Sequence, residues 1–132
     1  MKKLLELTFS CLLLITVVSC KKEASVASLN GTWELKSVVG GQLAASPSTD
    51  KHVIQLRFAD QRYEKYDNDQ LTESGTYTVT AEKKAINDNQ ANYYLTTQGD
   101  NKQYIKLSTN ELVVFVGQIA ADGVEMHYTK LK

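Results

Sequence analysis

Short runs in which apolar and polar residues alternate, separated by turn residues, fill the chain from residue 31 to residue 131. Successive side chains of a β-strand point to opposite faces, so a period of two is typical of strands with one buried face. The first run, residues 31–39, places four residues on the face that carries the single Trp of the chain: Trp33, Leu35, Ser37 and Val39. No helical period longer than one turn interrupts the runs, and we therefore expect an all-β domain.

The runs indicate eight strands. They are expected at residues 31–39, 53–58, 62–67, 75–79, 93–97, 104–108, 112–116 and 124–131. Two connections between them are long: residues 40–50, which hold the only Pro, and the polar residues 82–91. Loops as long as the first often border binding sites. In the third run Tyr63 and Tyr66 fall on opposite faces, which predicts a bulge or an irregular register there.

Eight strands joined in sequence by turns have few compact arrangements. An open sheet of this size would expose two unpaired edges, whereas a closed barrel has none. We therefore expect an eight-stranded up-and-down antiparallel barrel, with a flattened β-sandwich as the alternative. Trp33 begins the first strand, and we expect this large aromatic side chain to plug one end of the barrel against Val26 and Leu29.

Residues 1–19 have the pattern of an export signal rather than of a folded segment. A positive start is followed by thirteen uncharged residues, 7–19, which are too few to cross a bilayer as a helix. The end of this run, Val17-Val18-Ser19-Cys20, resembles the lipobox of bacterial lipoproteins. The resemblance implies cleavage before Cys20, with diacylglycerol on its sulfur and an acyl chain on its new amine. The alternative is an ordinary signal peptide that holds a Cys.

This reading divides the chain into three segments. Residues 1–19 are the expected lipoprotein signal peptide, residues 20–28 the lipidated Cys and a tether, and residues 29–132 the barrel domain. The expected partner is a membrane of the cell envelope, bound through the lipid on Cys20. The residue after Cys20 is not Asp. By resemblance to the sorting rule of enterobacterial lipoproteins, this favours the outer membrane. Residues 21–23 resemble either a surface-export tag of Bacteroidetes lipoproteins or a solvated linker, which leaves the face of the outer membrane open.

Charge and cysteine content limit the partners of the mature chain. The 15 basic and 15 acidic side chains of the full chain cancel, and the expected cleavage removes two Lys and one Glu. A net charge of about −1 provides no electrostatic footprint for nucleic acid. Cys11 leaves with the signal and Cys20 would carry lipid, so we expect no disulfide. The domain is expected to be a monomer.

Five motifs resemble those of one known family. They are Asn30-Gly31-Thr32-Trp33-Glu34-Leu35, Ile54-x-Leu56-x-Phe58, Gly75-Thr76-Tyr77, Leu112-Val113 and Met126-x-Tyr128. Their order and spacing over residues 29–132 resemble the lipocalin-like lipoproteins of Bacteroidetes. The resemblance implies a lipocalin-like barrel with Trp33 near its closed end. The chain is shorter than a full lipocalin and lacks its C-terminal helix, so it stays open whether the interior holds a roomy cavity.

Patterns of catalysis and metal binding are not found in the sequence. His52 and His127, the only histidines, are far apart, with no Cys or clustered carboxylate at metal-ligand spacing. The sequence contains no nucleophile elbow, phosphate-binding loop or HExxH motif. We therefore expect no enzyme, no metal and no cofactor. Alternation with Met126 and Tyr128 predicts that His127 points outward.

Seven residues are candidates for a ligand site inside the barrel: Leu35, Leu43, Ile54, Leu56, Phe58, Tyr77 and Tyr93. Leu43 lies in the long loop, where solvent alone would not select an apolar side chain. The tyrosines expected to point inward are Tyr63, Tyr77 and Tyr93, and those expected to point outward are Tyr66, Tyr94 and Tyr104.

Two functions are consistent with these patterns. The first is a membrane-anchored envelope lipoprotein whose barrel binds a small apolar or amphipathic molecule. The second is a barrel filled by its own side chains, with Leu43 sealing a dry core, that acts through its outer surface as a protein-interaction or inhibitor module. A cavity of several hundred cubic ångströms would favour the first, and a packed interior the second.

Overall fold

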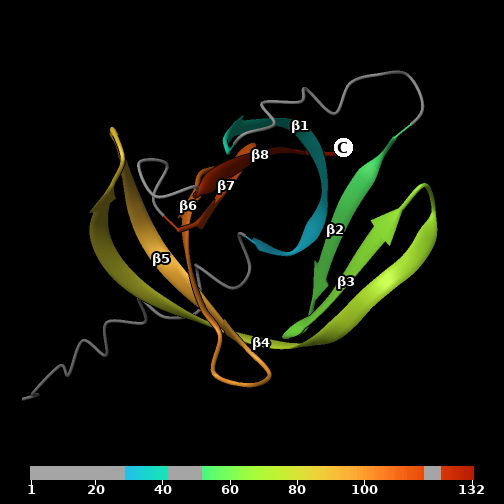
Figure 1. The fold of residues 1–132 in the computed structure, drawn as a ribbon. Coiled ribbons are helices and arrows are strands. Elements are labelled where there is room, and N and C mark those ends of the chain that lie inside the picture. Colours follow the sequence, from blue (N-terminus) through green and yellow to red (C-terminus); the bar gives the residue numbers. More distant parts are fainter. Residues whose placement is uncertain (1–28, 42–51, 118–122) are drawn as a thin grey trace, which may run out of the picture.

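The computed structural model describes residues 29–41, 52–117 and 123–132. Its strands are β1 (Gly31–Gly40), β2 (Ile54–Ala59), β3 (Arg62–Asp67), β4 (Gln70–Ile86), β5 (Asn89–Thr97), β6 (Lys102–Leu107), β7 (Glu111–Val116) and β8 (Val124–Lys130). Each strand pairs antiparallel with its neighbour in sequence, and β1 pairs with β8, which closes the barrel (Figure 1). The expected all-β, eight-stranded up-and-down barrel is confirmed.

Several predictions fall on residues outside the described ranges. The signal peptide, Cys20 and the tether lie in residues 1–28, as does Val26. Most of the loop expected at residues 40–50, including Leu43, also lies outside. These remain predictions. Among the described residues, no helix is long and apolar enough to cross a membrane.

The inner face of the barrel forms the main hydrophobic core. Its buried members are Leu29, Trp33, Phe58, Tyr77, Val79, Leu95, Ile105, Leu107, Leu112, Val114 and Tyr128. Leu35, Leu56, Tyr63, Tyr93 and Met126 are partly buried and pack against them. The alternation of the sequence therefore predicted the inward face of most strands, because strand side chains follow the same period of two in the folded sheet.

A bulge in β1 corrects the predicted face of its second half. Leu35 pairs with Tyr128, but Ser37 pairs with His127, so Lys36 is an extra residue in this strand. One extra residue moves every later side chain of the strand to the opposite face of the sheet. Val39 was predicted to share the face of Trp33 and is instead 46% exposed. The prediction was wrong for Ser37 and Val39 because alternation cannot reveal an inserted residue.

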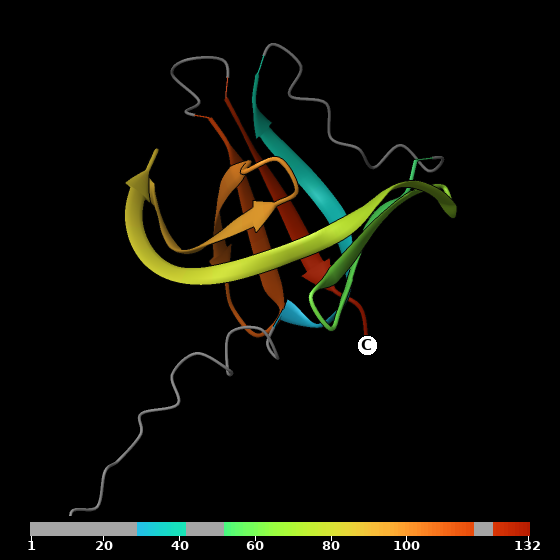
Figure 2. The same cartoon turned by 90° about the horizontal axis from the view of Figure 1, so that it is seen from below.

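Strand β4 is the longest element and changes partner along its length. Residues 70–76 pair with β3, and residues 77–86 pair with β5. Figure 2 shows this strand curving across the barrel between its two partners. The predicted irregularity of the third strand is only partly found. The register between β3 and β4 shifts between Lys65 and Tyr66, but the extra residue, Thr72, lies in β4, and β3 pairs with β2 without a shift.

The prediction that residues 82–91 form a polar connection was wrong. They continue β4 to Ile86 and begin β5 at Asn89, with a second register shift between Ala81 and Lys84. This hairpin covers the outer face of β6 and β7, where it forms a second cluster: Ile86, Ala91, Val113 and Phe115, with Tyr104 packed against it. The cluster explains why residues 112–116 are apolar on both faces. One face of the strand enters the barrel, and the other lies under the hairpin.

Trp33 lies at one end of the barrel together with Leu29. Both side chains are 0% exposed, and the Trp33 indole nitrogen donates a hydrogen bond to the Leu29 carbonyl oxygen at 2.8 Å. Trp33 pairs with Leu56 on one side and Lys130 on the other. This placement is the one that a structural plug requires.

Candidate functional site

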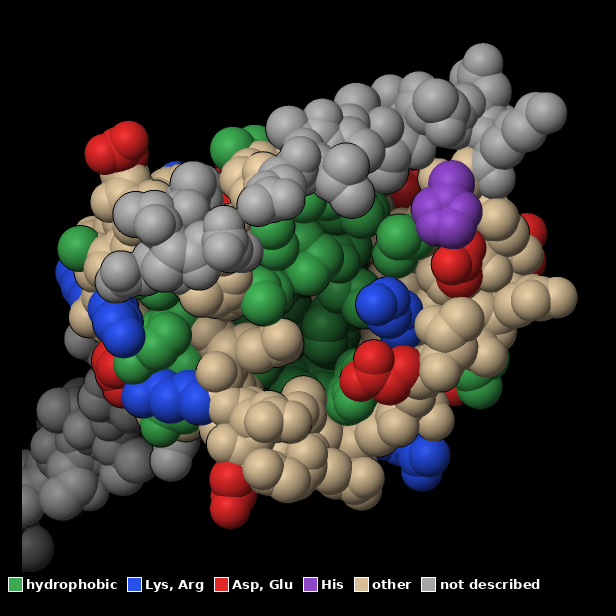
Figure 3. Space-filling model, viewed as in Figure 1, with side chains coloured by type: hydrophobic (Ala, Val, Ile, Leu, Met, Phe, Trp, Pro, Cys, Tyr) green, Lys and Arg blue, Asp and Glu red, His purple; other side chains and the backbone are tan. Residues whose placement is uncertain are grey.

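The barrel encloses a cavity of about 420 Å³. Its apolar wall is formed mainly by five side chains from the inner faces of β2, β5, β7 and β8: Leu56, Phe58, Leu95, Val114 and Met126. Figure 3, which looks into the ring of strands, shows a hollow lined by hydrophobic side chains. A cavity of this volume is within the range of small-molecule sites. The interior is therefore not completely filled by its own side chains.

The cavity opens at the end of the barrel opposite Trp33. Polar lining residues gather there: Lys65, Glu73, Thr97, Asn101 and Gln103. Val116 and Gly117, at the end of β7, also line the cavity, and Val116 pairs with Val124, which in turn pairs with Gly40. The end of β1 at Gly40 therefore lies at this mouth, and most of the loop predicted to border it lies outside the described residues.

The change of partner in β4 creates one side of the mouth. Tyr77 pairs with Thr97, the last residue of β5, whereas the earlier residues of β4 pair with β3 alone. Glu73, in the part of β4 that pairs with β3, and Thr97, at the end of β5, therefore both border the cavity. An apolar interior with polar groups at its entrance suits a molecule that has both an apolar and a polar part.

At the mouth, the Tyr63 hydroxyl donates a hydrogen bond to Glu73 Oε1 at 2.7 Å. This hydrogen bond to the Glu73 carboxylate raises the pKa of Tyr63 above its usual value. Tyr63 lies across Gly75, where a Cβ atom would come within 3.0 Å of the tyrosine ring. Lys65 pairs with Glu73 across the two strands, yet its amine makes no ion pair or hydrogen bond with the other described residues.

Two tyrosines lie deep in the cavity. Tyr77 is 2% exposed and Tyr128 is 3% exposed. The Tyr77 hydroxyl has no hydrogen-bond partner among the described residues. The Tyr128 hydroxyl donates to the Met126 sulfur at 3.5 Å. Burial raises the pKa of Tyr77 and raises the pKa of Tyr128 to about 12, so both are neutral hydrogen-bond donors at ordinary pH.

The predicted site residues are only partly brought together. Leu56, Phe58 and Tyr77 line the cavity. Leu35 and Tyr93 pack against the core but do not line the cavity, and Leu43 is outside the described residues. Ile54 belongs to the same face of β2 as Leu56 but does not line the cavity.

Sequence reasoning missed several residues that line the cavity: Lys65, Glu73, Leu95, Val114, Met126 and Tyr128. Tyr63, which was predicted to point inward, also lines the cavity. The alternation of residues 124–131 had placed Met126 and Tyr128 inward, and this signal could have added both to the site. Lys65 and Glu73 carried no such signal, because charged residues beside a turn are normally solvated. Among the described residues, no group of three or more His, Cys, Asp or Glu side chains is placed to hold a metal.

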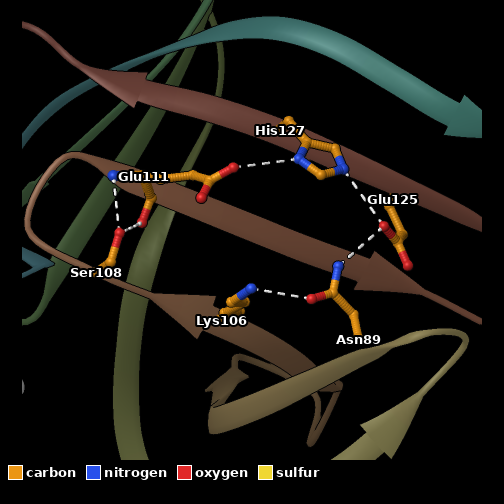
Figure 4. Close-up of polar contacts among 6 residues, drawn as sticks. All are labelled: Asn89, Lys106, Ser108, Glu111, Glu125 and His127. Carbon is orange, nitrogen blue, oxygen red and sulfur yellow. Dashed lines mark hydrogen bonds and ion pairs between the residues drawn. The ribbon is translucent and has the colours of Figure 1, made fainter.

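A separate polar network lies on the outer surface of β6, β7 and β8 (Figure 4). Glu125, only 6% exposed, accepts hydrogen bonds from Asn87 Nδ2 at 2.7 Å and Asn89 Nδ2 at 3.5 Å. His127 points outward, as its alternation predicted. Its Nε2 lies 3.3 Å from Glu125 Oε2, and its Nδ1 lies 3.5 Å from Glu111 Oε1. The network ties the hairpin of β4 and β5 to β8.

Comparison with protein families gives one match. Residues 29–114 match the family model described as lipocalin-like domain. The match covers more than half of the 132-residue chain and includes β1 to β6 with the first part of β7. No curated protein and no solved structure matches the chain significantly.

Proposed function

The chain belongs to the lipocalin-like domain family, and on this premise we propose that it binds a small apolar or amphipathic molecule inside its barrel. Lipocalin-like domains are generally binding proteins rather than enzymes. The observation that carries the proposal is the cavity of about 420 Å³, with an apolar wall and a polar mouth. A barrel that acted only through its outer surface would have no need of such a space, since protein interiors are ordinarily close-packed.

The mouth supports an amphipathic rather than a purely apolar ligand. An apolar body would contact Leu56, Leu95 and Val114, while Lys65 and Asn101 would lie beside a polar end. The Lys65 amine can donate three hydrogen bonds, and it makes no hydrogen bond or ion pair with the other described residues. A ligand that enters with its apolar part first satisfies both regions of the site.

Native mass spectrometry tests this function. The probe is residues 20–132 carrying Cys20→Ala, a chain that contains every strand and lacks only the expected lipid attachment. It is incubated with a bacterial lipid and metabolite extract, re-purified, and examined for retained species. We expect a retained small molecule and its loss in Leu95→Trp, which fills the cavity.

Thr78→Phe is the matched control, because Thr78 neighbours Tyr77 in β4 but is exposed on the outer face. This variant should retain the molecule. If the parent chain retains nothing, the cavity proposal fails, and a protein-interaction or inhibitor module acting through the outer surface takes its place.

We also propose that this binding takes place in the cell envelope, with the barrel held to the outer membrane by lipid on Cys20. The support is the lipobox-like sequence Val17-Val18-Ser19-Cys20 behind an uncharged run. Two or more acyl chains anchor a protein stably, whereas a single chain binds only reversibly. A lipid anchor would keep the binding site at the membrane.

A further inference from the structure

Two oppositely charged residues share the inner face of the barrel at the cavity mouth. Lys65 of β3 pairs directly with Glu73 of β4, and on its other side it pairs with Leu56, which packs against the core. Side chains of directly paired residues lie on the same face of a sheet. All three residues line the cavity, and Figure 3 shows basic and acidic side chains at the edge of the hollow. Two opposite charges on a mostly apolar inner face require an explanation.

These two charges do not pair with each other. Opposite charges at directly paired positions normally attract across a sheet. Among the described residues, however, the Lys65 amine makes no ion pair or hydrogen bond. The Glu73 carboxylate accepts one hydrogen bond, on Oε1, from the Tyr63 hydroxyl at 2.7 Å. The amine and the second carboxylate oxygen therefore remain available to a bound molecule.

The position of Tyr63 explains why Glu73 turns away from Lys65. Gly75 pairs with Tyr63 and has no side chain, so the tyrosine can lie across β4. A Cβ atom at this glycine would lie 3.0 Å from the tyrosine ring and 3.3 Å from the hydroxyl oxygen. The hydroxyl thereby reaches the Glu73 carboxylate, and a hydrogen bond to a charged acceptor is strong enough to hold it there.

We propose that the ligand has a zwitterionic head group, with an anionic group paired to the Lys65 amine and an ammonium group paired to the Glu73 carboxylate. This inference rests on the proposed function and deepens it, because it names the chemical class of the polar end. The apolar chain of the same molecule would lie against Leu56 and Val114 inside the cavity. Tyr63 would act as a positioning residue that keeps the two charges of the protein apart.

A zwitterion satisfies both charges of the mouth, whereas other head groups satisfy one or neither. An anionic head group could pair with Lys65 but would lie close to the like charge of Glu73, and a cationic one would have the reverse difficulty. Lys102 also lines the cavity, but it does not change this balance. Its amine lies 3.2 Å from Glu82 Oε2 and 3.9 Å from the centroid of the Tyr94 ring, so it already has partners.

The experiment compares head groups on one apolar chain. The zwitterion is 2-aminododecanoic acid; dodecanoic acid lacks its ammonium group, undecylamine lacks its carboxylate, and 1-undecanol is neutral. Each is titrated at neutral pH, below its critical micelle concentration, into residues 20–132 carrying Cys20→Ala, where it displaces the fluorescent reporter N-phenyl-1-naphthylamine. We expect the zwitterion to bind roughly five times more tightly than either singly charged probe, which is the effect of one partly exposed ion pair.

A second zwitterion and added salt define the head group further. Dodecylphosphoethanolamine carries a phosphate in place of the carboxylate, and the tighter of the two zwitterions identifies the anion that the site prefers. Added salt should reduce the advantage of a zwitterion over 1-undecanol, because screening weakens ion pairs that are partly exposed.

Three variants assign the preference to residues. Lys65→Met should weaken binding of the zwitterion and of dodecanoic acid roughly fivefold, and Glu73→Gln should weaken binding of the zwitterion and of undecylamine by a similar factor. Tyr63→Phe releases Glu73 to pair with Lys65 and should reduce the advantage of the zwitterion. Binding of 1-undecanol should change by less than about twofold in each variant, which shows that the apolar cavity is intact.

The matched controls are Arg57→Gln and Glu64→Gln. Arg57 follows Leu56 in β2, and Glu64 precedes Lys65 in β3. Both side chains lie on the outer face, where they contact Tyr66. Each control removes one charge of the same sign close to the site, and neither should change the affinity for any probe by more than about twofold.

The outcomes separate this inference from the proposed function. If all four probes bind with equal affinity, or if the Lys65 and Glu73 variants weaken 1-undecanol as much as the zwitterion, the cavity binds ligands but the zwitterion assignment is wrong. Tighter binding of dodecanoic acid than of either zwitterion would also overturn it, because Glu73 would then take no part in recognition. If neither the probes nor the reporter bind, the proposed function itself fails.

Discussion

The Trp33 indole nitrogen donates a hydrogen bond to the Leu29 carbonyl oxygen across four residues, and both side chains are completely buried. A buried indole N–H normally needs such an acceptor. The bond holds the residues that precede β1 against the floor of the barrel. Leu29 and Trp33 thus lie together at the end of the barrel opposite the cavity mouth. The closed and open ends of the barrel are therefore distinguished by particular residues.

Replacing Trp33 tests the floor of the barrel. Trp33→Ala should lower the free energy of unfolding by about 3–5 kcal/mol, because it removes a large buried side chain and leaves a cavity. Trp33→Phe should lower it less, while leaving the Leu29 carbonyl without its donor. Urea unfolding followed by circular dichroism measures both. The control is Val39→Ala at an exposed position, expected to stay within about 0.5 kcal/mol. A loss below about 1 kcal/mol in Trp33→Ala would show that the side chain supports little of the core.

Gly75 provides a test of the cavity mouth. A Cβ atom at this position would lie 3.0 Å from Tyr63 Cε1 and 3.3 Å from its hydroxyl oxygen. Gly75→Ala should therefore push Tyr63 aside, weaken its bond to Glu73 and cost about 1–3 kcal/mol, the usual range for overpacking. Thermal unfolding measures the change. The same substitution in a Tyr63→Ala background, which removes the ring that the Cβ atom would meet, should cost less, and equal costs would locate the strain elsewhere.

The outer network predicts that Glu125 holds the hairpin of β4 and β5. Glu125→Ala removes the acceptor of the Asn87 and Asn89 side-chain amides and should lower stability by about 1–3 kcal/mol. Hydrogen exchange should accelerate most in residues 82–91, since the hairpin opens before the barrel does. Glu111→Ala is the matched control, because this carboxylate contacts the same His127 but is exposed, and it should have little effect. Uniform acceleration through the barrel would contradict the local role.

Much of the barrel could be predicted because its strands are regular. In β2 the alternation of Ile54, Leu56 and Phe58 continues unbroken, and the pairing with β3 has no shift. The single period of two was therefore enough to assign the inner face. Asp60 and Gln61, both with positive φ, form the turn between β2 and β3, within one residue of the gap expected between residues 58 and 62.

The bulges could not be predicted, because an inserted residue has no sequence signal of its own here. Lys36 shifts the second half of β1 by one position, and the residues between Ala81 and Lys84 shift β4 in the same way. The polar hairpin that follows was missed for a related reason. Its two buried residues, Ile86 and Ala91, pack outside the barrel. The prediction assumed a single core inside the barrel and therefore did not include them.

The candidate site depends on which inward residues border empty space, and sequence alone does not reveal this. Tyr93 and Tyr77 both point inward, but only Tyr77 lines the cavity. The difference follows from the change of partner in β4, which separates Glu73 from Thr97 and opens the mouth between them. Such long-range geometry arises from packing of strands distant in sequence, not from any local pattern.

The lipid anchor gives a prediction that is independent of the cavity. Cys20→Ala should release the protein from the membrane fraction without unfolding the barrel, because the described strands begin only at Gly31. Membrane fractionation with a salt wash measures retention, and circular dichroism measures the fold. Ser19→Ala, which keeps both a small residue before the cysteine and the cysteine itself, is the control and should stay membrane-bound. Retention of the Cys20→Ala protein in the membrane fraction after the salt wash would contradict the anchor proposal.

Burial of Tyr128 predicts how stability responds to alkaline pH. Burial raises the pKa of this hydroxyl to about 12, whereas an unfolded tyrosine titrates near about 10. Below pH 10 the hydroxyl is protonated in both states, and its contribution to stability is fully present. Between about pH 10 and 12 only the unfolded state loses the proton, so the free energy of unfolding falls with pH by about 1.4 kcal/mol per unit. The loss from this group should reach about 2–3 kcal/mol at pH 12.

Tyr128→Phe isolates that contribution, because other groups with raised pKa values, such as Tyr77, destabilise both proteins alike at high pH. The measurement is the free energy of unfolding in urea at pH 8, 10 and 11.5 for the parent and for the variant. We expect the stability of the variant relative to the parent to increase steadily above pH 10 and to be constant below it. A constant difference throughout this range would mean that the Tyr128 hydroxyl ionises as readily in the folded barrel as in the unfolded chain, and that the inner cavity is hydrated rather than apolar.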